Sequence, residues 1–258
     1  MILDTLKLDG KVAIITGAGR GLGRAMAVKF AQAGADIVAA SRTQAQLDET
    51  AEEVKKTGRK CVIVPTDVTV SAQVNALAEL TIKEFGKIDI LINNAALYAP
   101  LPTLKVTEID VELWDKVMGI NIRGPFLMVK HVAPHMIAKK YGKIVNIGSG
   151  TVARGIPDFS HYVTSKGAVT AFTRCVSREL GAHGICVNTL APGYTLSDTG
   201  LTNTVHVEQS KAAAVARRAL KRDQYPEDLL GTLIYLCSSD SDFMTGQVLA
   251  VDGGANNT

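Results

Sequence analysis

The segment VAIITGAGRGLG, residues 12–23, joins a short apolar run to a glycine-rich turn and leads into a helical pattern. The apolar run, Val12 to Thr16, indicates a buried strand. Glycines after it allow the backbone to turn tightly and to place N–H groups against a phosphate at the positive end of the next helix. A turn with only a packing role is the alternative. The order strand, turn, helix favours a phosphate site, although the spacing of Gly17, Gly21 and Gly23 is GxxxGxG and not GxGxxG.

The remaining chain repeats this alternation of short apolar runs and longer periodic stretches. We predict strands at Val12–Thr16, Ile37–Ala40, Cys61–Val64, Ile88–Asn93, Lys143–Ile147, Ile185–Leu190 and Val248–Val251. We predict helices at Gly21–Ala33, Gln44–Thr57, Ser71–Phe85, Val111–Lys139, Phe159–His183 and Pro226–Ser238. The pattern favours an α/β fold, a single-domain doubly wound (Rossmann) fold over residues 1–258, with a seven-stranded parallel sheet and helices on both faces.

One long connection breaks the alternation. The stretch from Tyr194 to Asp223 separates a predicted strand from a predicted helix at the end of the sheet where ligands of such folds bind. Long connections at that end commonly cover a substrate. We therefore expect a substrate lid over about residues 194–223, with further candidates for the wall of a substrate pocket at Leu97, Tyr98, Val152, Phe159, Tyr194 and Leu201.

Composition and charge argue against several classes of function. Of the 258 residues, 47% are hydrophobic and 21% charged, which is typical of a globular protein with a sizeable core. The net charge of +3 is too small to suggest a nucleic acid or a membrane as partner. No run of roughly 18 apolar residues occurs, and the N-terminus lacks a signal pattern. We expect a soluble, cytoplasmic protein.

Neither a disulfide framework nor a metal site is indicated. The four cysteines, Cys61, Cys175, Cys186 and Cys237, are far apart and lie in apolar runs, so we expect buried free thiols. His131 and His135 have i, i+4 spacing, but no carboxylate or thiol stands near them in the sequence, and a solvated helix face is the better interpretation. We expect no metal.

The end of the second predicted strand carries information about the cofactor. A carboxylate there would accept hydrogen bonds from the adenosine ribose, whereas an arginine would accommodate a 2′-phosphate. The chain has Ser41 and Arg42 at this place, and Arg20 lies in the glycine turn. Two guanidinium groups suit a dianionic phosphate, so NADP(H) is favoured and NAD(H) remains possible.

Tyr162 and Lys166 form a candidate proton-transfer pair. Their i, i+4 spacing in a predicted helix places both side chains on one face. A free tyrosine has a pKa near ~10, and a neighbouring ammonium is the simplest means of lowering that pKa. The pair could therefore exchange a proton with an alcohol or a carbonyl. The motif alone also describes many ordinary exposed lysines.

Several motifs in register resemble the short-chain dehydrogenase/reductase family, in its shorter single-domain branch. The resemblance spans nearly the whole chain. Its motifs are Thr16 to Gly23, Asp67-Val68, Asn93-Asn94-Ala95-Ala96, Asn121, Ser149, Tyr162 with Lys166, Pro192-Gly193, Thr245-Gly246 and Val251-Asp252-Gly253-Gly254. It implies an oxidoreductase that transfers hydride between a nicotinamide cofactor and a small carbonyl or secondary alcohol.

The resemblance also implies roles for individual residues. Tyr162 would act as general acid or base, Lys166 would lower the pKa of Tyr162 and hold the nicotinamide ribose, Ser149 would bind the substrate oxygen, and Asn121 would position a water. Tyr194 would contact substrate. Cofactor contacts would come from Gly17, Arg20, Gly21, Leu22, Gly23, Ser41, Arg42, Asp67, Val68, Asn94, Tyr162, Lys166, Pro192, Gly193, Thr195 and Ser197. Family members of this kind are commonly homotetramers.

The chain departs from the family pattern in two places. Ala96 stands where glycine is usual, and Ser197 stands where a threonine commonly contacts the nicotinamide. The alternatives to an NADP(H)-dependent reductase are an NAD-dependent alcohol dehydrogenase of the same family and a non-catalytic NADP(H)-sensing protein.

Two further features have competing interpretations. His161 points about 100° away from Tyr162, so a surface or pocket-rim position is favoured over a second acid. A basic group in the predicted lid suits a solvated helix better than a site for an acidic substrate or an acyl carrier protein; it comprises Lys211, Arg217, Arg218, Lys221 and Arg222.

Overall fold

The computed structural model describes residues 6–98, 101–197 and 204–256, without the side chains of residues 204–210. Its centre is a seven-stranded parallel sheet with the strand order β3-β2-β1-β4-β5-β6-β7. The strands are β1 Val12–Thr16, β2 Asp36–Ser41, β3 Cys61–Pro65, β4 Ile90–Asn93, β5 Gly142–Ile147, β6 Ile185–Pro192 and β7 Val248–Val251. The predicted fold class is confirmed. The strand order reverses between β1 and β4, which is where such sheets bind ligands.

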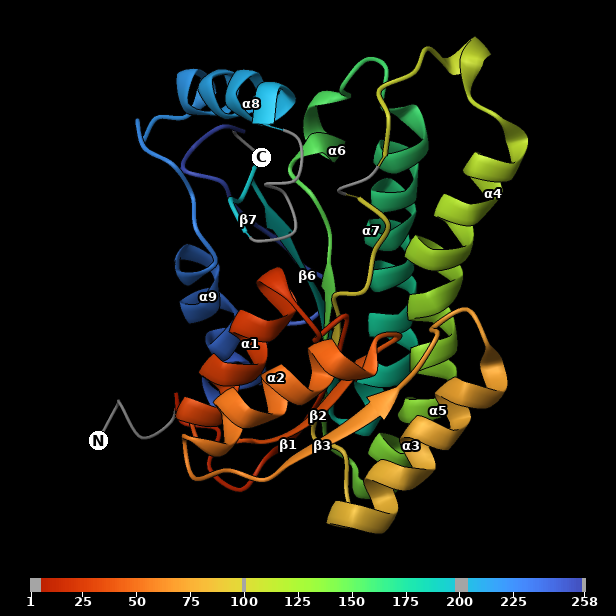
Figure 1. Cartoon of the computed structure of the whole chain (residues 1–258). Coiled ribbons are helices and arrows are strands. Elements are labelled where there is room, and N and C mark those ends of the chain that lie inside the picture. Colours follow the sequence, from red (N-terminus) through yellow and green to blue (C-terminus); the bar gives the residue numbers. More distant parts are fainter. Residues whose placement is uncertain (1–5, 99–100, 198–203, 257–258) are drawn as a thin grey trace.

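Helices cover both faces of the sheet (Figure 1). They are α1 Gly21–Gln32, α2 Gln44–Lys55, α3 Ser71–Phe85, α4 Val111–Met118, α5 Gly124–Lys139, α6 Thr151–Arg154, α7 Ser160–Leu180, α8 Thr204–Arg217 and α9 Glu227–Cys237. In the described part of the chain, no helix is both long and apolar enough to cross a membrane.

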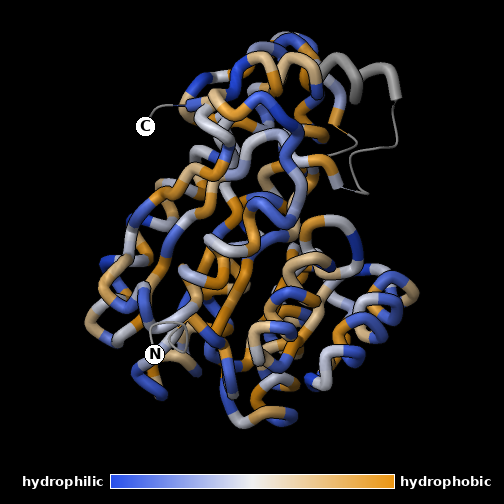
Figure 2. Tube along the Cα trace, turned by 90° about the vertical axis from the view of Figure 1, so that its left-hand side faces the viewer, coloured by the Kyte–Doolittle hydropathy of each residue, from blue (hydrophilic) through white to orange (hydrophobic). Residues whose placement is uncertain are grey.

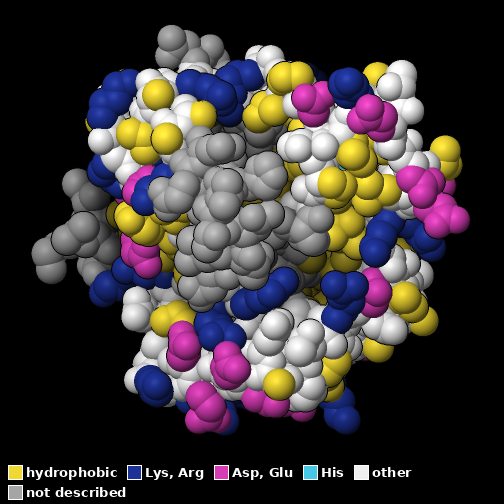
Figure 3. Space-filling model, turned by 45° about the horizontal axis from the view of Figure 1, so that its top comes forward, with side chains coloured by type: hydrophobic (Ala, Val, Ile, Leu, Met, Phe, Trp, Pro, Cys, Tyr) yellow, Lys and Arg dark blue, Asp and Glu magenta, His cyan; other side chains and the backbone are white. Residues whose placement is uncertain are grey.

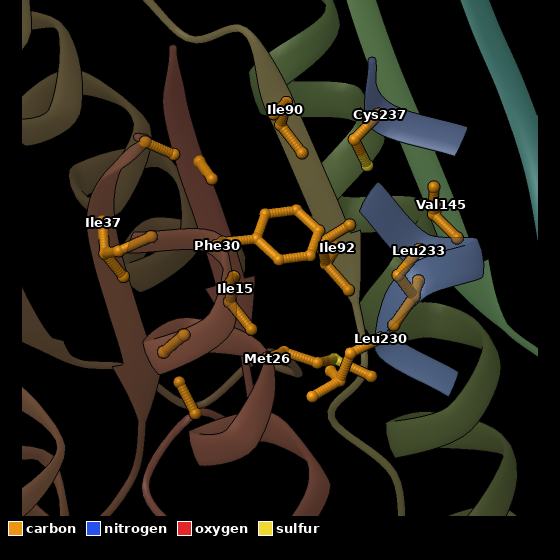
Figure 4. Close-up of a cluster of buried hydrophobic side chains, with 14 of the residues drawn as sticks. Ile15, Met26, Phe30, Ile37, Ile90, Ile92, Val145, Leu230, Leu233 and Cys237 are labelled. Atoms are coloured by element: carbon orange, nitrogen blue, oxygen red, sulfur yellow. The ribbon is translucent and has the colours of Figure 1, made fainter. Parts of the chain in front are cut away.

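Adjacent residues of each strand face opposite sides of the sheet and enter different cores. Ile15 belongs to a cluster with Met26 and Phe30 of α1 and Leu233 of α9, which Figure 4 shows. Ile14 belongs to a second cluster that includes residues of α3, α5 and α7. Figure 2 shows the same arrangement as hydrophobic strands inside more hydrophilic helices. Two dry cores hold the sheet rigid, so that the ends of its strands can position a site.

The structure differs from the predicted elements in three places. The expected helix Val111–Lys139 is interrupted by a π-helical turn, Gly119–Arg123, between α4 and α5. The short helix α6 follows β5 and was not predicted. The expected lid contains α8, while residues 198–203, including the wall candidate Leu201, lie outside the described residues.

Two predictions about burial need correction. All four cysteines are free, but Cys175 is exposed because it lies on the outer face of α7, and Cys61 is only half-buried on β3. His161 is fully buried instead of lying at the surface.

Candidate active site

The candidate proton-transfer residues meet at the carboxyl end of β5. Ser149 follows this strand, and α7 brings Tyr162 and Lys166 to the same place, where both are buried. The ammonium of Lys166 lies 5.7 Å from the centre of the Tyr162 ring and donates a 2.7 Å hydrogen bond to the Ile147 carbonyl. Ser149 hydrogen-bonds the Tyr162 hydroxyl. The three side chains that the sequence singled out are therefore neighbours.

Burial controls the protonation of this pair. Desolvation raises the pKa of Tyr162, with a smaller contribution from Tyr98 and a partly opposing hydrogen bond from Ser149. Desolvation also lowers the pKa of Lys166 to about 8. The sequence led us to expect a lowered tyrosine pKa. The direction differs because the phenol lies in a dry aromatic pocket and the ammonium is directed at the Ile147 carbonyl.

Aromatic rings enclose the Tyr162 phenol. Phe159 lies 5.0 Å and Tyr98 lies 5.1 Å from the Tyr162 ring, measured between ring centres. Phe159 also contacts His161 edge-on at 5.2 Å. Two of the predicted wall residues, Tyr98 and Phe159, therefore stand directly at the candidate proton donor. They exclude water from it, which strengthens every polar interaction inside the pocket.

Asn121 lies in the π-helical turn that interrupts the long helix. Its side-chain oxygen accepts a 2.7 Å hydrogen bond from the Leu97 N–H, and its amide group donates to the Leu97 carbonyl and to Ser165. Ser165 belongs to α7, one residue before Lys166. Asn121 therefore ties the segment after β4 to α7, in a local distortion of a kind that is frequent at functional sites.

His161 is a buried residue that sequence reasoning placed wrongly. It is 0% exposed, and neither ring nitrogen has a hydrogen-bond partner among the described residues. The sequence correctly placed it off the Tyr162 face of α7. Because α7 is covered by α4 and by the π-helical turn as well as by the sheet, that other face is also buried.

The glycine turn after β1 forms a cradle in which side chains cannot be accommodated. A β-carbon on Gly23 would lie 2.1 Å from the Gly17 carbonyl oxygen, and one on Gly17 would lie 2.9 Å from the Asn94 amide nitrogen. The Asn94 side chain donates to the carbonyls of Thr16 and Gly17, which fixes the turn. Gly21 and Leu22 are the first residues of α1, so the backbone N–H groups at the N-terminus of this helix face the glycine turn.

Polar groups beside this turn fit a nucleotide phosphate. The Ser41 hydroxyl at the end of β2 is buried and has no partner among the described residues, and it lies where a β-carbon on Gly19 would approach to 2.8 Å. Arg20 and Arg42 are exposed, and their side chains make no hydrogen bond or ion pair with the described part of the chain. The residues present therefore fit a phosphorylated adenosine.

The other predicted contacts line the same edge of the sheet. The Asp67 carboxylate accepts hydrogen bonds from Thr69, which lower its pKa, with a smaller lowering by the charge of Arg42. Val68 is buried against Gly124. At the end of β6, the Pro192 carbonyl accepts a hydrogen bond from the Gly150 N–H, and the Gly193 N–H donates to the Val251 carbonyl.

The segment after Gly193 approaches the expected lid. The Thr195 hydroxyl donates to the Gly193 carbonyl, and the Tyr194 carbonyl accepts from Arg218. A cavity of about 800 Å³ extends from Gly21 to Ser197 between α1 and α9, beside this segment, and its lining does not include Tyr162.

Comparison with known proteins identifies the family. A family model described as enoyl-(acyl carrier protein) reductase matches residues 17–256. The chain is 38% identical to 2-dehydro-3-deoxy-D-gluconate 5-dehydrogenase of Escherichia coli, over 98% of each chain. It is 33% identical to a 3-oxoacyl-acyl-carrier-protein reductase of Thermotoga maritima, over 96% of this chain and 99% of the relative.

A solved structure supports the same assignment. A short-chain type dehydrogenase/reductase from Mycobacterium marinum superimposes on the chain with a TM-score of 0.92 and 31% identity, covering 100% of both chains. These relatives are oxidoreductases of alcohols or ketones, and their names cover different substrates. The chain belongs to the short-chain dehydrogenase/reductase family and is an oxidoreductase acting on CH–OH groups.

Proposed function

We propose that the chain is an NADP(H)-dependent reductase of a small carbonyl compound, reversible in principle, in which Tyr162 transfers the proton. The observation that carries the proposal is the buried phenol of Tyr162, hydrogen-bonded to Ser149 and adjacent to Lys166, at the same sheet edge as the glycine turn. The bound nicotinamide would supply the hydride.

The residues of the site suit the reductive direction. Hydride addition leaves negative charge on the substrate oxygen, and donors aimed at that oxygen stabilise the transition state more than the neutral ketone. Because burial raises the pKa of Tyr162, the phenol keeps its proton at neutral pH and can donate it. Ser149 would donate the second hydrogen bond. Lys166 would orient the nicotinamide ribose, and Asn121 would hold a water linking Lys166 to solvent.

The remaining contacts of the proposal follow the carboxyl edge of the sheet. Asp67 and Val68 would bind around the adenine, and Asn94 would lie near a ribose. Pro192, Gly193, Thr195 and Ser197 would contact the nicotinamide, and residues 194–223 would close over the substrate, with Tyr194 touching it. We further propose a cytoplasmic homotetramer built from this single domain.

Substitution of the phenol tests the reaction. Tyr162→Phe removes the proton donor while keeping the ring, so turnover in a screen of ketones followed by NADPH absorbance should fall by at least ~10²-fold. NADPH binding, measured by fluorescence titration, should stay within about threefold of wild type, since the substitution removes one hydroxyl. Tyr235→Phe on α9, remote from the site, is the matched control. Near-normal turnover in Tyr162→Phe would refute the assigned role.

Substitution of the two arginines tests the cofactor. Replacing Arg20 and Arg42 with alanine should lower kcat/KM for NADPH by roughly 10- to 100-fold per arginine and leave that for NADH nearly unchanged, because each guanidinium would lose a charge-assisted hydrogen bond. Arg178→Ala, exposed on α7, is the control. A wild-type preference for NADH would favour an NAD-dependent alcohol dehydrogenase. NADPH binding without any turnover would favour a sensing protein.

A further inference from the structure

Arg218, directly after α8, is a buried arginine without an acidic partner in the described part of the chain. It is 3% exposed, whereas Figure 3 shows other Lys and Arg side chains at the surface of this end of the molecule. The carboxylate of Asp223 pairs with Lys211 at 3.3 Å, and that of Asp228 pairs with Arg222 at 2.6 Å. Burying an unpaired charge costs free energy, so the hydrogen bonds that Arg218 makes must offset that cost.

The guanidinium of Arg218 binds oxygen atoms on both sides of the chain connection that it starts. It donates to the carbonyl of Tyr194, which follows β6. It also donates to the Arg222 carbonyl at 2.8 Å and to the side-chain oxygen of Gln224 at 3.4 Å. Its stem lies against the backbone after β7, because a β-carbon on Gly253 would lie 3.2 Å from the Arg218 Cδ. Arg218 therefore joins the end of α8 to the segments that follow β6 and β7.

Gln224 holds the segment after β6 from a second position. Gln224 is 5% exposed, and its side-chain amide donates to the Val251 carbonyl of β7 at 2.6 Å. Its backbone carbonyl accepts a 2.8 Å hydrogen bond from the Leu196 N–H. A β-carbon on Gly193 would lie 2.6 Å from the Gln224 side-chain oxygen, so this amide packs directly on the Gly193 backbone. The backbone from Gly193 to Leu196 is thus held by Gln224 as well as by Arg218.

We propose that Arg218 and Gln224 are positioning residues, which hold the segment after β6 where it contacts the nicotinamide half of the cofactor. The inference rests on the proposed function, in which Gly193 and Thr195 contact the nicotinamide and Tyr194 contacts the substrate. It adds the two side chains that fix this segment. Hydrogen bonds from a charged donor in a buried place are stronger than those between neutral groups, so Arg218 carries the larger part. Without the two side chains, the N–H and carbonyl groups of the segment would lose their fixed direction.

The test compares binding of the whole cofactor with binding of its adenosine half. The adenosine half is expected at the ends of β1 and β2, on the other side of β4 and β5 from β6. For Arg218→Met, we expect the Kd of NADPH to rise by roughly 5- to 50-fold and that of adenosine 2′,5′-bisphosphate to change by less than about threefold, both by calorimetry. Gln224→Leu should act in the same direction. Arg218→Lys keeps a charged donor for the Tyr194 carbonyl and should recover part of the affinity.

The matched control is Arg217→Met, which removes an exposed guanidinium one residue earlier and should leave both Kd values within about threefold. Equal weakening of NADPH and of the adenosine fragment would overturn the inference, as would a lowered melting temperature with unchanged NADPH binding. Preference of the wild type for NADH would overturn the proposed cofactor only, and the same comparison would then use NADH and adenosine 5′-monophosphate. Absence of binding of either dinucleotide to the wild type would overturn both proposals. If Arg218→Met does not fold, Arg218→Lys and Gln224→Leu decide.

Discussion

Tyr162 and Lys166 show how far residue-level reasoning extends. Their spacing correctly predicted that they share one face of a helix, because that follows from helical geometry alone. The direction of the tyrosine pKa did not follow from the sequence, since it depends on the rings of Tyr98 and Phe159 that exclude water and on the carbonyl of Ile147. His161 was misplaced for a related reason, because burial depends on which other elements cover a helix.

The buried ammonium of Lys166 should lower the stability of the fold. Replacing Lys166 with an apolar residue should therefore raise that stability. Because its folded pKa of about 8 lies below the unfolded value of ~10.4, the fold disfavours the ammonium below about pH 8, and this cost vanishes as the pH rises through ~10.4. We expect Lys166→Met to raise the free energy of unfolding at pH 7 by about 1–3 kcal/mol, less the lost hydrogen bond to Ile147, and to abolish most turnover. Urea unfolding at pH 7 and pH 10 measures it.

The matched control for this substitution is Lys130→Met, at an exposed position of α5. It should change the free energy of unfolding little at either pH. A Lys166→Met variant less stable than wild type at pH 7 would show that the ammonium stabilises the fold.

Substitution of His161 tests whether its ring nitrogens are satisfied. Two buried nitrogens without partners cost about 1–3 kcal/mol, so His161→Leu should leave the free energy of unfolding unchanged or raise it. Thermal and urea unfolding measure it, with His183→Leu in the exposed 3-10 turn after α7 as control. Clear destabilisation by His161→Leu would indicate that the ring binds buried water.

At the scale of elements, the strands were predicted well and the helix distortions were not. In a chain that alternates short apolar runs with helical stretches, short β-branched runs between turns indicate strands. All seven predicted strands occur, and their ends lie within a few residues of the predicted ends. The π-helical turn at Gly119–Arg123 leaves no local signature, because its extra residue is stabilised by contacts of Asn121 with Leu97 and Ser165 that are distant in sequence. Asn121 itself was found only through the family motif.

Asp89 joins three elements at the opposite end of the sheet. It precedes β4, accepts a hydrogen bond from Val12 of β1 and pairs with Lys139 at the end of α5. Burial alone would raise the pKa of Asp89, but the hydrogen bonds from Lys139 and Val12 and the charges of Lys139 and Lys87 hold it below its usual value.

Asp89→Asn should therefore destabilise the protein by about 2–4 kcal/mol at pH 7, because it leaves Lys139 without its carboxylate. A carboxylate with a lowered pKa stabilises above its unfolded pKa of ~3.9, and this contribution is lost as the pH falls through the folded value. The difference between wild type and variant should shrink in acid, as urea unfolding between pH 7 and pH 3 would show. Asp115→Asn, exposed on α4, is the control; a difference that persists in acid would refute the linkage.

At the scale of the whole molecule, the sequence predicted one doubly wound domain. The two separate cores give the physical reason for this fold. Each strand carries apolar residues on both faces, which only helices on both sides can cover. The path of the expected lid was not predictable, because few of its residues share a hydrophobic pattern. Its basic group illustrates this, since Arg218 is buried while Arg217 is exposed.

The outer edge of the sheet is a candidate for an interface between copies of the chain. β7 is an edge strand, Val248 is partly exposed, and Phe243 just before this strand is fully exposed. An unpaired strand edge beside an exposed phenylalanine is where a partner could pair and bury apolar surface. We expect sedimentation velocity to show a tetramer, and Phe243→Asp to weaken assembly by roughly 10- to 100-fold in Kd, since each buried phenylalanine contributes about 1.5–3 kcal/mol. Val70→Asp is the control, and an unchanged assembly would place the interface elsewhere.

The contact between Gly23 and the Gly17 carbonyl limits how this protein can evolve. No side chain fits at that crossing without displacing the turn, so we expect substitutions there to disrupt the turn and not to shift the choice of cofactor. Around the same turn lie Ser41, Arg20 and Arg42. Their side chains can be replaced without moving the backbone. Descendants of this protein could therefore change their preference between NADP(H) and NAD(H) by replacing a few of these side chains, while the glycine turn stays unchanged.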